Sequence, residues 1–159
     1  MNIGIIIYSH SGHTLFVGEK IKETLLAQGH SVRLEKISAA NEDPQSKERI
    51  LLTAIPDISP YDAVIFGAPV AAFQLSPIMR AYFAQLPALQ GRKAACFVTQ
   101  QLKKKWMGSS RAVKQITRAV EQKGTPIIAS GIVQWSSEAR EEQILQVVDI
   151  LSRAYESEA

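Results

Sequence analysis

The residues best suited to chemistry are small hydroxyl side chains near the start of the chain. Ser9, Ser11 and Thr14 surround Gly12 directly after an apolar run, and the sequence becomes helical from Thr14 onward. A strand, a polar turn and a helix in this order bring backbone N–H groups and the positive end of a helix dipole together. The turn therefore predicts a phosphate site made of hydroxyls and amides. The alternative interpretation is an ordinary helix N-cap in a tight turn.

Other kinds of catalytic or phosphate-binding loop are missing from the sequence. The turn contains no lysine and no G-x-x-x-x-G-K, and no G-x-G-x-x-G follows the first strand. It also lacks the C-x-x-x-x-x-R of a low-molecular-weight phosphatase, and G-x-S-x-G is absent. The third buried strand ends in Phe66-Gly67, without the carboxylates of a phosphoacceptor receiver, and the three histidines lack metal-ligand spacing. We therefore predict no catalytic acid, base or nucleophile and no metal site, and expect a bound cofactor to supply the chemistry.

Alternating strands and helices must position this turn. Apolar runs predict strands at 2–8, 31–37, 62–67, 93–98 and 127–133, and helical periodicity follows each of them, weakly so at 47–54. This pattern favours a doubly wound α/β fold with helices on both faces of a parallel sheet. Because the first, third and fourth strands are the most apolar, we expect the strand order 2-1-3-4-5. We expect one domain over residues 1–159.

Ligands of such sheets bind beyond the carboxyl ends of the strands, beside the point where the strand order reverses. The loops that reach this edge are residues 9–14, 67–75 and 99–108. We therefore expect residues 67–75 and 99–108 to form one ligand site together with the phosphate loop at residues 9–14.

Two of these loops resemble a known family. Ser9-x-Ser11-Gly12-x-Thr14 after a buried strand resembles the FMN-phosphate loop of flavodoxins and flavodoxin-fold quinone reductases. Phe66-Gly67-Ala68-Pro69-Val70 followed by Phe73-x-Leu75-Ser76-Pro77 resembles the stretch that turns under their flavin ring. Family members often carry an aromatic residue two positions after the proline, where this chain has Ala71, so Phe73 is the nearest candidate. The resemblance is strongest at 2–14 and 62–86, moderate at 92–109, and only topological after 125.

The resemblance implies a flavodoxin-like three-layer sandwich that binds FMN without a covalent bond. For the phosphate it implies the residues Ser9, His10, Ser11, Gly12, His13 and Thr14. For the ring it implies Ala68, Pro69, Val70, Ala71, Phe73, Thr99, Gln100, Gln101, Trp106 and Gly108. Thr99 and Gln100 are expected to donate to ring oxygens, and Phe73 or Trp106 to stack on the ring. An alternative for Trp106 is a core position under the following helix.

The family leaves two redox functions open, and a third class of function remains beside them. An electron carrier requires a redox partner protein, whereas a reductase requires NAD(P)H, a quinone-type small-molecule acceptor and, in many cases, a homo-oligomer around the site. The third possibility is a flavin-less binding or regulatory module, to which Ala71 points. Lys103, Lys104 and Lys105 lie where a rim beside the ring is expected, and a basic rim would attract an acidic partner or the phosphates of NAD(P)H. The alternative is a merely solvated lysine run.

Composition bears on the class of protein and on its expected location in the cell. The chain has 159 residues, of which 46% are hydrophobic, which suits one compact domain. A net charge of +3 is small and scattered, so we expect no nucleic-acid partner. No run is long enough to cross a membrane and no leader pattern is present, and the single Cys96 lies in an apolar strand-like run. These features predict a cytoplasmic protein with a buried thiol and no disulfide.

Overall fold

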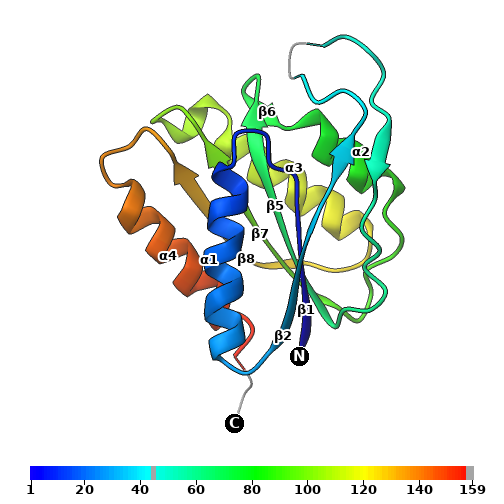
Figure 1. Cartoon of the computed structure of the whole chain (residues 1–159), viewed down its shortest axis with the longest axis vertical. Coiled ribbons are helices and arrows are strands. Elements are labelled where there is room, and N and C mark those ends of the chain that lie inside the picture. The colour runs from blue at the N-terminus through cyan, green and yellow to red at the C-terminus, as the bar shows by residue number, and fades with distance from the viewer. Residues whose placement is uncertain (44–45, 157–159) are drawn as a thin grey trace.

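The computed structural model describes residues 1–43 and 46–156, and a parallel sheet lies at its centre (Figure 1). The sheet contains β1 (Asn2–Ile7), β2 (Ser31–Lys36), β5 (Ala63–Ala71), β7 (Lys93–Gln100) and β8 (Ile127–Gln134). These strands run parallel in the order β2-β1-β5-β7-β8. Numbered along the chain, this is the predicted order 2-1-3-4-5.

Helices cover both faces of the sheet, as predicted. The helices α1 (His13–Ala27) and α4 (Arg140–Arg153) pack on one face, and α2 (Pro77–Gln85) and α3 (Ser109–Gln122) pack on the other (Figure 1). Successive side chains of a strand point to opposite faces, so Ile5 and Ile7 of β1 pack under α1 while Ile6 packs toward α2. The continuous apolar run of β1 is thus explained by burial on two sides.

Several local signals in the sequence act as expected. Gly29 follows α1 with φ +92°, a left-handed conformation that glycine adopts without strain. Pro77 is the first residue of α2, after Ser76 as N-cap. Cys96 is completely buried in β7. Among the described residues, no helix is both long enough and apolar enough to span a lipid bilayer.

The weak helix expected at 47–54 is wrong. In its place, β4 (Leu52–Ala54) pairs antiparallel with β3 (Ser38–Ala39). From Ile50 to Ala54 the side chains alternate between half-buried and exposed, which is the period of a strand and not of a helix. The segment between β2 and β5 therefore carries no helix in its described part.

Two strands extend beyond their predicted ends. β5 continues through Pro69 to Ala71, turns at Ala72 and Phe73, and pairs with the short β6 (Gln74–Leu75). Ala72 and Phe73 have φ of +50° and +64° in this turn. β7 continues to Gln100, and a short 3₁₀ helix, η1 (Lys105–Met107), precedes α3. The second and third loops of the predicted site are thus partly regular structure.

Candidate functional site

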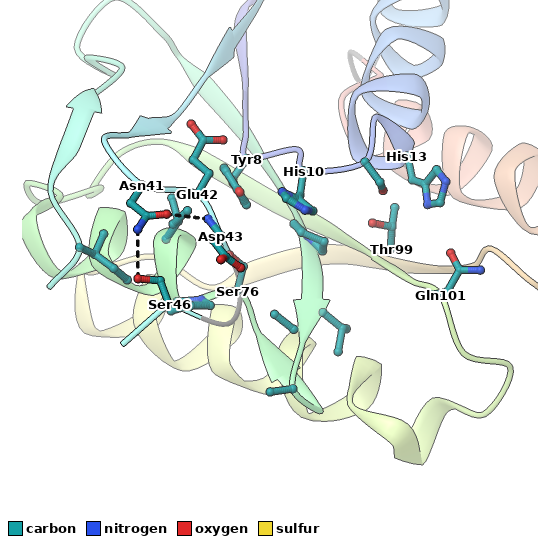
Figure 2. Close-up of a pocket in the computed structure, with 18 of the residues that line it drawn as sticks. Tyr8, His10, His13, Asn41, Glu42, Asp43, Ser46, Ser76, Thr99 and Gln101 are labelled. Atoms are coloured by element: carbon teal, nitrogen blue, oxygen red, sulfur yellow. Dashed lines mark hydrogen bonds between the residues drawn. The ribbon is translucent and has the colours of Figure 1, made fainter. Parts of the chain in front are cut away.

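A cavity of about 520 Å³ lies at the carboxyl ends of β1, β5 and β7. This is the edge at which the sequence placed the site. Nine of the predicted site residues line the cavity, namely His10, Ser11, His13, Pro69, Val70, Ala71, Thr99, Gln100 and Gln101. Figure 2 shows His10 near the middle, with Thr99, Gln101 and His13 on one side of it and Asn41, Glu42 and Ser46 on the other.

The turn at residues 9–14 has the geometry of an anion site. Gly12 is the N-cap of α1 with φ +90°, and no side chain caps the helix from that position. The first amides of a helix have no carbonyl partner inside it. The Leu15 amide donates to Ser9 Oγ at 3.2 Å, and His13, the first residue of the helix, lines the cavity. Ser11 is exposed in the same turn.

Thr14 joins the first loop to the third. Its side chain is only 2% exposed, and its Oγ1 lies 2.9 Å from Thr99 Oγ1, so one hydroxyl donates to the other. Each hydroxyl has one proton and two acceptor positions. The pair therefore has one proton left over for a further acceptor.

Gln100 holds the third loop in place. Its buried side chain donates to the carbonyl oxygens of Leu102 and Lys104 at 3.0 and 2.6 Å and accepts from the Ser109 amide at 2.9 Å. Both ends of the amide group are engaged inside the loop. A direct contact of this side chain with a ring, as expected from the sequence, remains a prediction, whereas its effect on the shape of the loop is evident.

Gly108 brings the second and third loops together. Its φ is +129°, and a Cβ atom there would lie 2.6 Å from Val70 Cγ1 and 2.7 Å from the backbone carbon of Phe73. Only a residue without a side chain permits this approach. Ala68 is completely buried in β5.

The two aromatic residues expected to stack on a ring are strongly exposed. Phe73 is 60% and Trp106 is 76% exposed, and neither lines the cavity. The alternative core position of Trp106 is therefore wrong. Stacking on a bound ring stays a prediction for both residues.

Sequence reasoning missed Trp135, which directly follows β8. Its indole stacks on the imidazole of His13 with centroids 3.9 Å apart and an interplanar angle of 10°. Arg140 lies over the indole at 4.9 Å and donates to the Trp135 carbonyl oxygen at 3.0 Å. Because the carboxyl end of a parallel strand reaches the ligand-binding edge, an aromatic residue at the end of the last strand was the available signal.

Burial and the positive charge of Arg140 lower the pKa of His13 below its ordinary value of 6.5. The folded protein therefore favours the neutral imidazole. This contribution to stability is present above about pH 6.5 and is lost as the pH falls through the lower folded pKa.

In the variant Arg140→Gln, we expect the pKa of His13 to rise while staying below 6.5, because burial still disfavours the imidazolium. An NMR titration of the His13 ring protons measures this shift. Arg153→Gln, at the other end of α4, is the matched control and should leave the pKa of His13 unchanged. An unchanged pKa in Arg140→Gln would contradict the assigned cause.

The segment between β2 and β4 forms a wall of the cavity that sequence reasoning also missed. Asn41, Glu42, Asp43, Ser46 and Glu48 line this side, and no lysine or arginine lines the cavity in the described part of the chain. Asn41 donates to Ser46 Oγ at 3.0 Å, and its Oδ1 accepts from the Asp43 amide at 3.0 Å (Figure 2).

Tyr8 stands beside this wall at the end of β1. Burial, together with the charge and the hydrogen bond of Glu42, raises the pKa of Tyr8 to about 12. The phenol is therefore protonated at neutral pH. The cavity thus has a neutral, amide-rich side at residues 9–14 and an acidic side at Glu42, Asp43 and Glu48.

Comparison with solved structures identifies the fold. Flavodoxin 2 from Bacillus cereus superposes with a TM-score of 0.71 at 17% identity, over 98% of this chain and all of that chain. A flavodoxin from Pseudomonas aeruginosa, solved as a cysteine-to-serine mutant, has a TM-score of 0.69 at 14% identity, over 99% of this chain and all of that one. The chain has the flavodoxin fold.

The same fold also matches part of a larger solved protein. Rubredoxin oxygen:oxidoreductase from Desulfovibrio gigas matches 96% of this chain with a TM-score of 0.67 at 16% identity, but this chain spans only 35% of that protein. No family model matches the sequence, and no curated protein matches it either. Identities this low show the fold alone, so the function rests on the site.

Proposed function

We propose that the protein is a redox protein that binds FMN, with the phosphate on residues 9–14. The observation that carries this proposal is the position of the α1 N-terminus. It begins after Gly12, and its neighbours Ser11 and His13 line the cavity beside β1 and β5, where the strand order reverses. Amides and a helix dipole stabilise a phosphate dianion without a lysine. The solved structures that share the fold include several flavodoxins, which supports the same proposal.

The polarity of the cavity favours one orientation of the proposed cofactor. Glu42, Asp43 and Glu48 would repel a phosphate at their side, whereas residues 9–14 would hold it. The ring would then lie against the backbone of residues 69–72 and beside Thr99 and Gln101. FMN, when bound, supplies the electron or hydride chemistry, and the chain binds it, orients it and limits its contact with water.

This placement predicts an effect on His13 that requires no catalysis. A phosphate dianion beside the N-terminus of α1 favours the imidazolium, so FMN should raise the pKa of His13 from its lowered value. Riboflavin has no phosphate and should leave this pKa nearly unchanged. NMR titrations of the protein alone, with FMN and with riboflavin test the proposal. If FMN and riboflavin changed the pKa of His13 equally, the phosphate would not lie on this loop.

Within this function, we propose reduction by NAD(P)H rather than service as a housekeeping electron carrier. Lys103 and Lys104 are exposed on the loop beside Gln101, and they would attract the phosphates of a nicotinamide cofactor. The side chain of Lys105 lies outside the described part of the structure.

The rate of FMN reduction by NADPH and by NADH separates the two redox functions. We expect reduction by at least one cofactor, and a slower rate after Lys103→Ala and Lys104→Ala or at raised salt. If neither cofactor reduces the flavin, while a reduced protein donor does so at a rate indifferent to the lysines, the carrier function replaces the reductase.

A further inference from the structure

The charges of the chain are strongly segregated, contrary to the scattered distribution expected from the sequence. Residues 63–120 contain nine of the 18 lysines and arginines and none of the 15 aspartates and glutamates. The rest of the chain therefore carries nine cations against all 15 carboxylates. The small net charge of +3 is therefore the sum of a basic segment, residues 63–120, and an acidic remainder of the chain.

The fold places four of these nine cations on two helices of one face. Arg80 lies on α2, and Arg111, Lys114 and Arg118 are exposed on α3. Both helices cover the face of the sheet opposite α1 and α4 (Figure 1). The ion pairs found among the described residues, Lys20–Glu23 and Arg153–Asp149, lie on α1 and α4. The cations of the α2–α3 face therefore have no carboxylate partner in the described chain.

A groove of about 390 Å³ runs between α2 and α3 on this face. Its apolar lining residues, called the apolar floor below, are Leu75, Phe83, Ala84 and Ala119, of which Leu75 and Phe83 are buried. The cationic lining residues, called the rim below, are Arg80, Arg118 and Lys123; Gln115 and Gln122 are the other polar ones, and none of the described lining residues is acidic. An apolar floor inside a cationic rim is complementary to apolar side chains flanked by carboxylates.

The groove adjoins the cavity of the candidate site. Leu75 lines the groove, and the next two residues, Ser76 and Pro77, line the cavity. Gln115 of α3 holds this segment against the groove, because its side chain accepts from the Leu75 amide at 2.8 Å and donates to Gln74 at 3.2 Å. A molecule in the groove would therefore lie against the segment that leads into the cavity.

We propose that the α2–α3 groove docks an acidic polypeptide segment that presents apolar side chains between carboxylates. Unpaired cations supply charge complementarity, and the apolar floor favours a polypeptide over a nucleic acid, whose phosphates need only the rim. An amphipathic helix laid into a groove is a common form of such recognition. The interaction requires no flavin and goes beyond the proposed cofactor function.

The test uses the full chain and a fluorescent probe peptide, about 18 residues long, with leucines at helical spacing and glutamates elsewhere. We expect saturable binding that Arg118→Glu and Lys123→Glu each weaken about fivefold or more, as expected for reversed charges at a rim. Lys36→Glu, on β2, changes the net charge equally and should change the affinity less than about twofold. A peptide of the same composition without the leucine stripe should bind about tenfold more weakly, because it cannot fill the apolar floor. Circular dichroism checks that each variant is folded.

Three results would overturn the proposal. Equal weakening by Lys36→Glu would show an effect of overall charge only. If the two peptides bound equally tightly, the apolar floor would not contribute to peptide binding. Tighter binding of duplex DNA or of vesicles rich in phosphatidylserine, lost with Arg118→Glu and Lys123→Glu, would assign the face to a nucleic acid or to a membrane surface.

Discussion

The variant Gly108→Ala is expected to lose about 2–5 kcal/mol of unfolding free energy, the sum of left-handed backbone strain and overpacking. The strain arises because Gly108 has φ +129°. The overpacking arises because the new methyl group would lie 2.6 Å from Val70 Cγ1 and 2.7 Å from the backbone of Phe73. Backbone atoms cannot move aside as a flexible side chain does, so residues 70–73 or the start of α3 must shift.

Gly29→Ala is the matched control. Gly29 has φ +92°, and a methyl group there would meet nothing within 4 Å. This variant should lose only the strain, about 1–2 kcal/mol. Urea denaturation of both variants measures the difference. Equal losses would show that the contact between the two loops at the cavity is not tight.

Ser11→Ala is expected to weaken FMN binding about 10- to 150-fold, which corresponds to about 1.5–3 kcal/mol for a hydrogen bond to a charged group. Riboflavin affinity and stability should hardly change, because Ser11 is exposed at the mouth of the cavity. Fluorescence titration with each flavin measures both affinities.

Thr14→Val is the informative companion. It keeps the shape of the side chain but leaves the Thr99 hydroxyl buried without its partner at 2.9 Å. It should therefore weaken FMN binding and also lower stability by about 1–3 kcal/mol. If Ser11→Ala weakened FMN and riboflavin equally, the phosphate would not lie on this loop.

The strands of the sheet could be predicted from the sequence because burial on both faces requires apolar residues in them. Ile3, Ile5, Ile6 and Ile7 of β1 are completely buried between two helical layers, and such a run of β-branched residues has few other uses. Gly29 and Pro77 marked helix boundaries because each imposes a backbone conformation that few other residues favour.

The parts of the site that were not predicted depend on tertiary packing. The segment around Glu42 lines the cavity because β3 and β4 pair where a helix was expected, and pairing between distant residues leaves little local signal. Trp135 contacts His13 because β8 and β1 end at the same edge of the sheet. Trp135 directly follows β8, and His13 lies in the turn that follows β1. Gln100 has a residue type suited to ligand contacts, and only its hydrogen bonds reveal that it supports the loop.

Titration of the flavin-free protein with FMN tests the central proposal most directly. Binding at residues 9–14 and in the adjoining cavity predicts that flavin fluorescence changes to an end point of one FMN per chain, and that riboflavin binds more weakly. FMN that keeps its free fluorescence and shows no saturable binding, with a protein verified as folded, would contradict the account.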